Sequence, residues 1–401
     1  MYLNHAIMYV RAMDTSDGKI LKFFLVIVAL VFVSALLYIQ FFSSSLHTSS
    51  LFADNLKPSA DVKQLDNEIQ CISPENTSET RLAVLHDFDE FIKAKFNGLT
   101  TPQDYQDVYM LLKTRIDRVI KEINETSVPP GELKLWYIYN MGVIAKTSNI
   151  TIGFDLAGTY VYPSLADLGE SVDVLLITHT HGDHFDKNVI MKAKEHGATI
   201  IIPDGKVRVD HSGLTPFIVK DPHGMNMLDA LKQLGLDTSG LTAIEPNETI
   251  NIKGVSVTAF SGEHRTPSES IVESIYDTPV DWYYVNVSGF CLLHTGDGFL
   301  FDNIPNFSAK RVDVYFIHYT DGLTCEMYYR MVPNASMMIP LHLHELGHGR
   351  EMVLDIGMFK NALDQYNHGY LSLNFVQPNP TLMRYVPMIW GESLELGNAT
   401  K

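Results

Sequence analysis

Apolar and polar positions divide the chain into three zones of different texture. Residues 23–42 form an apolar run without a charged side chain, in which only Ser34 and Gln40 are clearly polar. Residues 79–125 repeat apolar side chains every three or four positions, which predicts two amphipathic helices separated near residues 97–102. From residue 133 onward, short apolar runs alternate with helical segments. This third pattern predicts a layered α/β domain.

The apolar run at 23–42 has the length of a membrane helix. Such a helix needs about 20 apolar residues, whereas the apolar part of a secretory signal usually has about 7–15. No small-residue cleavage pattern follows the run, so an uncleaved anchor is favoured over a removed signal peptide. Arg11, Lys19 and Lys22 precede it, and the next lysine is Lys57. The positive-inside rule then predicts a cytoplasmic N-terminus and a catalytic part outside the cytoplasm.

Sequons for asparagine-linked glycans agree with this single-pass topology. Many sequons in proteins stay unmodified, so their number supports the topology without proving it. The eight N-x-S/T sequons begin at Asn76, Asn124, Asn149, Asn247, Asn286, Asn306, Asn334 and Asn398.

We therefore divide the chain into a head at 1–22, an anchor at 23–42, a tether at 43–78, a helical hairpin at 79–130 and a catalytic domain at 131–401. The hairpin's apolar stripe must be buried, against the catalytic domain, as a lid or in a dimer. A net charge of −17 argues against nucleic acid as a partner. The three cysteines form neither a zinc-finger spacing nor a disulfide framework.

Candidate chemistry is concentrated directly after the apolar strand predicted at 174–177. His179, His181, Asp183 and His184 place four potential metal ligands within six positions of one tight loop. Histidines two positions apart can project to one side and share an ion, while the adjacent Asp183-His184 pair faces a second position. Imidazole suits zinc, iron and nickel, and a mixed imidazole and carboxylate set also accepts manganese.

The segment HTHGDH at 179–184 resembles the H-x-H-x-D-H signature of the metallo-β-lactamase superfamily. That resemblance implies a four-layer αβ/βα sandwich with a one- or two-metal site at its edge, usually used for hydrolysis. It covers residues 133–385, about two-thirds of the chain.

The same resemblance implies the remaining site residues, each placed after a predicted strand. It implies one metal held by His179, His181 and His264. It implies a second metal held by Asp183, His184 and His342, with Asp297 bridging the two ions and Asp155 supporting the ligands from behind. The expected cofactors are two divalent ions, zinc by preference, with manganese or iron as alternatives. A hydroxide shared by the ions would be the nucleophile, and Asp183 and Asp297 are the expected catalytic residues. His318, after another predicted strand, is expected near the rim without binding a metal.

Two features depart from the family pattern. The lactonase-like and N-acyl-phosphatidylethanolamine phospholipase-like branch opens with a W-x-G-H-A-type segment, which appears here as WYIYNMG at 136–142. The substrate of this chain is therefore not inferred from the substrates of that branch. His344, Glu345 and His348 fit the H-E-x-x-H pattern of zinc peptidases, which requires a helix. Here the pattern follows a predicted strand and contains Gly347, so we favour coincidence.

The sequence thus predicts a membrane-anchored, metal-dependent hydrolase. Its substrate would be a small or lipid-like molecule with an ester-type bond, either a phosphodiester or a lactone. A zinc peptidase and a non-catalytic membrane-anchored binding module remain as alternatives. A redox di-iron enzyme is disfavoured, because that branch typically carries a glutamate where this chain has His181.

Overall fold

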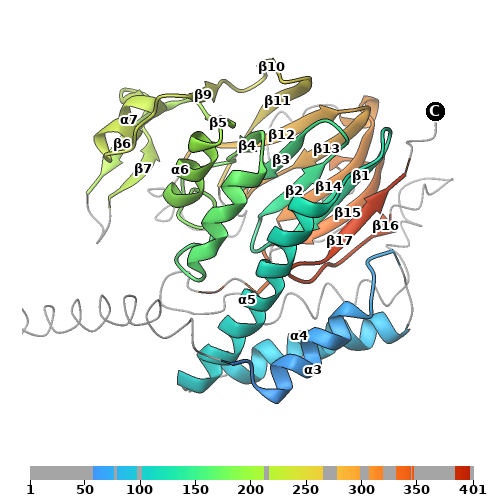
Figure 1. Ribbon diagram of the computed structural model, residues 1–401. Coiled ribbons are helices and arrows are strands. Elements are labelled where there is room, and N and C mark those ends of the chain that lie inside the picture. Colours follow the sequence, from blue (N-terminus) through green and yellow to red (C-terminus); the bar gives the residue numbers. More distant parts are fainter. Residues whose placement is uncertain are drawn as a thin grey trace, which may run out of the picture. The chain divides into compact units, whose positions relative to one another are not determined.

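Two seven-stranded sheets form the core of the unit Pro58–Lys401 in the computed structural model (Figure 1). The structure describes residues 57–75, 79–96, 102–211, 216–264, 278–298, 307–318, 331–344, 346 and 384–397. The proposed head and anchor lie outside these ranges, so the structure does not test them. Within the described ranges, no helix combines the length and apolar character needed to cross a bilayer.

The first sheet begins antiparallel and continues parallel. Its order is β17 (Ser393–Leu396), β1 (Leu133–Tyr137), β2 (Val143–Lys146), β3 (Thr151–Phe154), β4 (Val174–Leu176), β5 (Thr199–Pro203) and β9 (Leu241–Ile244). Because β3 and β4 run parallel, their carboxyl ends meet at one edge. The residues that follow these two strands therefore become neighbours.

The second sheet follows the same plan. Its first four strands are antiparallel and the later ones parallel. The order is β10 (Thr249–Ile252), β11 (Val255–Gly262), β12 (Val280–Val287), β13 (Phe290–His294), β14 (Val312–His318), β15 (Ala335–Leu341) and β16 (Arg384–Tyr385). β13, β14 and β15 deliver their carboxyl ends to a common edge.

The two sheets face each other across a buried layer. Tyr283 on β12 donates its hydroxyl to the carbonyl of Ile177, just after β4, at 3.0 Å. Phe154 on β3 stacks on His294 of β13 with ring centroids 5.2 Å apart. These contacts confirm the α/β sandwich. The fourth layer expected over the second sheet is untested, because the connections between β14, β15 and β16 lie mostly outside the described residues.

Shorter elements surround the sheets. Helix α6 packs on β5 and on η2, and η2 in turn contacts α5. A small third sheet, β7-β6-β8, was not foreseen from the sequence. The bounds are η2 (Pro163–Ser171), α6 (Lys187–Glu195), β6 (Lys206–Asp210), β7 (Phe217–Lys220), β8 (Met225–Asn226), α7 (Met227–Gln233) and η4 (Phe307–Ala309).

Before the sandwich, the described residues form three helices where we expected two. Helices α4 (Glu79–Phe96) and α5 (Pro102–Glu125) are the predicted hairpin. Residues 60–70, which we assigned to the tether at 43–78, form helix α3 (Ala60–Gln70) instead. Ser59 caps its first turn by accepting a hydrogen bond from the Val62 amide. The helix is short, and its apolar stripe is correspondingly brief, which explains why the pattern was missed.

Buried ion pairs fasten these helices to the segment before β17. Arg81 on α4 pairs with Glu392 at 2.5 Å and donates to the carbonyl of Pro387 at 2.6 Å. Arg115 on α5 donates to the carbonyl of Trp390 at 2.8 Å. Phe88 of the hairpin's apolar stripe also meets the ring of Trp390 edge-on, with centroids 5.2 Å apart, so packing on the catalytic domain is the option observed.

Asp66 joins α3 to α5. Its carboxylate lies 2.7 Å from Arg118 and 3.3 Å from Arg115. Burial acts to raise the pKa of Asp66, but the two arginines outweigh it and hold the pKa below the ordinary 3.8.

Asp66→Asn should lower the free energy of unfolding by about 3 kcal/mol at pH 7, because it leaves two arginines without their carboxylate. The wild-type contribution is present above the unfolded-state pKa and is lost as the pH falls through the depressed folded-state pKa. Denaturant unfolding of both proteins at neutral and acidic pH measures this, and the two curves should converge in acid. A constant gap between them down to low pH would contradict the assignment.

Candidate metal centre

The structure brings all seven expected ligands together at the carboxyl ends of the strands. The loop after β4 supplies His179, His181, Asp183 and His184, whereas His264 follows β11, Asp297 follows β13 and His342 follows β15. They form two groups, His179-His181-His264 and Asp183-His184-Asp297-His342. In each group the candidate ligand atoms lie within 4.8 Å of one another.

Asp297 lies between the two groups. Its Oδ2 is 3.5 Å from Nε2 of His264 and 4.0 Å from Nε2 of His179. Its Oδ1 is 3.1 Å from Nε2 of His184, and its Oδ2 is 3.7 Å from Nε2 of His342. One carboxylate therefore faces ligand atoms of both groups, which is the geometry a bridging ligand requires.

Burial keeps the imidazoles of His179 and His181 neutral. Burial, and then the neighbouring His184 and His181, hold the pKa of His179 well below its ordinary value. Burial and His264 lower the pKa of His181 to about 3. A neutral imidazole offers a lone pair to a cation, so these rings are in the protonation state that metal binding needs.

In the second group, the pKa values of His184 and Asp297, which lie 3.1 Å apart, shift in opposite directions. Burial acts to lower the pKa of His184, but Asp297, Asp183 and Asp155 outweigh it and raise the pKa well above its ordinary value. Burial acts to raise the pKa of Asp297, but His184, with other histidines, holds it well below. The carboxylates thus favour positive charge at this point, which a divalent cation can supply in place of a proton.

Unsatisfied polar atoms test whether the residues fit a metal. Nε2 of His179, Nε2 of His184 and Oδ1 of Asp297 are buried without a hydrogen-bond partner of acceptable geometry among the described residues. Leaving a buried polar group unsatisfied costs about 1–3 kcal/mol. All three atoms are potential metal ligands in the two groups, and the donor set therefore fits divalent cations.

Asp155 makes hydrogen bonds to the ligand loop. It is fully buried and accepts hydrogen bonds from the amide of Thr178 at 2.7 Å and from the Thr178 hydroxyl at 2.6 Å. Its Oδ2 lies 2.8 Å from Nδ1 of His184. A proton on Nδ1 leaves Nε2 of His184 to face Asp183 and Asp297, and such a partner both orients a ligating imidazole and increases its basicity.

Sequence reasoning missed Asn140. This buried residue follows β1 with a φ of 52°. Its side-chain amide donates to Oδ2 of Asp183 at 3.1 Å, and its carbonyl accepts from the amide of His342 at 3.0 Å. It therefore contacts ligands from both sheets. The one available signal was its place in the segment 136–142, where the family pattern changes.

The turn that carries Asp297 also has requirements of its own. His294 donates from Nε2 to the carbonyl of Met141 at 3.0 Å, and its Nδ1 accepts from the amide of Gly296 at 3.1 Å. Gly296 has a φ of 51°, and a Cβ there would lie 2.2 Å from the hydroxyl oxygen of Thr178. Glycine at this position therefore allows the turn to approach the first sheet.

Two further histidines differ in their relation to the site. His318 lies 3.7 Å from Oδ1 of Asp297, beside the site as expected. His344, the first residue of the H-E-x-x-H pattern, lies beyond the end of β15 with a φ of 57°. Its Nε2 contacts Asp89 on α4 at 2.9 Å. The described part of the pattern is not helical, and Glu345 and His348 lie outside the described residues.

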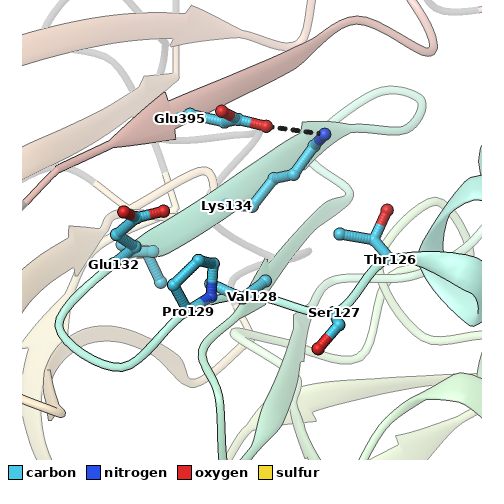
Figure 2. A pocket seen from close by; sticks show the side chains of 8 residues that line it. Thr126, Ser127, Val128, Pro129, Glu132, Lys134 and Glu395 are labelled. Atoms are coloured by element: carbon cyan, nitrogen blue, oxygen red, sulfur yellow. Dashed lines mark hydrogen bonds and ion pairs between the residues drawn. The ribbon is translucent and has the colours of Figure 1, made fainter.

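A pocket of about 170 Å³ lies elsewhere on the unit. It is bounded by the chain after α5, the start of β1 and β17, and Lys134 reaches Glu395 beside it at 3.0 Å (Figure 2). The metal groups follow the ends of strands, whereas this pocket adjoins the beginning of β1. None of the residues that line it belongs to the two ligand groups.

The sandwich, with one group of three histidines and a second group of two histidines and two aspartates, is that of a metal-dependent hydrolase. A family model described as the beta-lactamase superfamily domain matches residues 137–341, just over half of the chain. The chain belongs to this superfamily, and it is an enzyme of the metallo-β-lactamase fold.

Several solved structures are similar to this chain. Igni18, a metallo hydrolase from Ignicoccus hospitalis, is 14% identical over 66% of this chain and 98% of its own, with a TM-score of 0.43. A possible metal-dependent hydrolase from Veillonella parvula is 13% identical over 66% and 99%, with a TM-score of 0.44. CmlA, a diiron β-hydroxylase from Streptomyces venezuelae, is 14% identical over 77% and 62%, with a TM-score of 0.40. No curated protein matches the chain.

Asp155→Asn should weaken the binding of one metal ion by about 10- to 100-fold, because it removes a carboxylate that orients a ligating imidazole. Competition between the protein and a chelator for Zn²⁺ measures the affinity. Asp173→Asn is the matched control, since Asp173 accepts from the amide of Thr151 at the start of β3, at 2.8 Å. Equal metal affinity in Asp155→Asn and in the control would disprove the supporting role.

Proposed function

We propose that this protein is a dinuclear metal-dependent hydrolase that cleaves an ester-type bond. One ion would be held by His179, His181 and His264, and the other by Asp183, His184 and His342. The observation that carries the proposal is the position of Asp297, whose two oxygens face ligand atoms of both groups.

When bound, two adjacent divalent ions supply a nucleophile at neutral pH by lowering the pKa of a shared water, and they polarise the bond under attack. The chain's own residues position this chemistry. Asp297 fixes the separation of the two groups. Asp183 has its Oδ2 3.1 Å from Nε2 of His184 and accepts from Asn140. Its carboxylate is therefore held at the site, where it can orient a water or accept its proton.

Zinc is the ion we propose. The ligand set is rich in imidazole, which suits zinc, and its two carboxylates also accommodate manganese or iron. Elemental analysis of the purified protein distinguishes the three metals.

A phosphodiester or a lactone of a small or lipid-like molecule is the proposed substrate class. The apolar run at 23–42 supports a site held near a bilayer, with the N-terminus cytoplasmic and the enzyme extracytoplasmic. The sequons support the same topology, because all five that lie in described residues have exposed asparagines. These are Asn124, Asn149, Asn247, Asn286 and Asn334. The net charge of −17 argues against polyanionic nucleic acid as a substrate.

Metal content and hydrolysis by the full chain, purified in detergent, test the proposal. Wild type, Asp297→Ala and Glu345→Ala would be compared on phosphodiester, lactone and peptide substrates. We expect two ions per wild-type chain, and loss of at least one in Asp297→Ala. Hydrolysis by Asp297→Ala should fall by on the order of 10³-fold, the scale seen when a group that stabilises transition-state charge is removed.

Glu345→Ala is the control that separates the two metal motifs. It should keep both ions and full ester hydrolysis. A single ion that is unaffected by Asp297→Ala, together with peptide cleavage abolished by Glu345→Ala, would replace this proposal with a peptidase.

A further inference from the structure

We infer that Asp89 and His344 are positioning residues for the metal ligand His342, so that helix α4 is part of the metal centre's machinery. The inference rests on the proposed function, because it assigns a task toward one of the two proposed ions. It also gives a role to the first histidine of the H-E-x-x-H pattern, which the proposed chemistry leaves unused.

The backbone around His342 cannot hold its conformation by itself. His342 and His344 have φ values of 63° and 57°, in the left-handed region. Non-glycine residues adopt this region uncommonly, and they persist there where the surroundings impose that conformation. Two such residues, two positions apart, therefore need external contacts.

Three contacts from other elements supply that constraint. The amide of His342 donates to the carbonyl of Asn140 at 3.0 Å. Four residues further along the loop, the Tyr139 hydroxyl donates to the carbonyl of Leu346 at 2.9 Å and accepts from the Leu346 amide. Between these points, Nε2 of His344 contacts Oδ1 of Asp89 at 2.9 Å.

Asp89 is built to act as a fixed anchor. It is fully buried, and its other carboxylate oxygen accepts a hydrogen bond from Lys93 one turn further along α4. The His344 ring is held on a second side by Phe88, whose ring meets it edge-on at 5.0 Å between centroids. Asp89 therefore has a defined position, and its contact with His344 fixes the position of that ring.

His344 is only two positions from His342, so a displacement of His344 would reach the metal site. Nε2 of His342 lies 3.5 Å from Oδ2 of Asp183 and 3.7 Å from Oδ2 of Asp297. Release of His344 would free the backbone to leave the left-handed region, and His342 would move away from both carboxylates. His181 and His264 would keep their positions, because they come from other loops. The ion bound by His342 is therefore the one that depends on α4.

The test is a titration of the metal-free full chain with Co²⁺, followed by the visible absorption of the bound ion. Wild type should bind two ions. Asp89→Asn should weaken one of them about tenfold and change its absorption, while the other stays as in wild type.

Asp66→Asn is the matched control. Asp66 is also buried and belongs to the same helical layer. Among the described residues, its carboxylate pairs with Arg115 and Arg118 of α5 and accepts from Gln70, and it makes no hydrogen bond or ion pair with residues 342–344 or 346. It should lower stability without changing the affinity for either ion. His344→Gln, which keeps a donor toward Asp89, should recover part of the affinity that His344→Ala loses. Should Asp89→Asn fail to fold, Tyr139→Phe replaces it, since it removes the other anchor of the loop.

The outcomes separate the two claims. A wild-type chain that binds no Co²⁺ would overturn the proposed function and this inference with it. Two ions in wild type, bound with unchanged affinity in Asp89→Asn, would overturn the positioning role alone. Equal weakening in Asp89→Asn and Asp66→Asn would overturn it too, because the effect would then be one of general stability.

Discussion

The hydrogen bonds of one buried carboxylate, that of Asp155, hold the ligand loop in place. Asp155 follows β3 with a φ of 42° and accepts from both the amide and the hydroxyl of Thr178. It also binds the ring of His184. A buried carboxylate that lost these partners would carry a large desolvation penalty. The start of the loop, one of its ligands and the end of a neighbouring strand therefore move together or not at all.

Interactions between charged groups, rather than apolar packing, dominate the sheet edge where Asp155 and the ligands lie. The raised pKa of His184 and the lowered pKa of Asp297 are two sides of one interaction between buried groups. A proton on His184 and a divalent ion satisfy the same carboxylates, so they compete. Metal binding at this group should release protons, and acid should oppose it.

Local patterns predicted the strands, and they predicted which histidines and aspartates would lie together. Each of these residues follows an apolar run, and parallel strands bring such positions to a common edge, so the order of motifs along the chain was enough. The expected strand at 174–177 appears as β4. The roles of the ligands toward metal remain predictions, as does the membrane anchor.

Contacts between distant segments had no local signature. β17 completes the first sheet by pairing with β1. In this pair Glu395 lies opposite Lys134, although 261 positions separate the two residues in the sequence. The pairing of Asp89 with His344 is of the same kind. Neither partner is unusual in its own stretch of sequence, so only the folded chain reveals the pair. Helix α3 was missed for a different reason, since its apolar stripe is brief.

The distribution of ligands along the chain has a consequence for assembly. Four of the seven lie within one loop at 179–184, whereas Asp297 and His342 come from the other sheet, more than 110 residues later. An ion that reached a partly folded chain would therefore find only a local chelate. The shared site between two ions can form only after both sheets have closed on each other. Contacts of such long sequence separation form slowly, so a full complement of metal would report that the sandwich is complete.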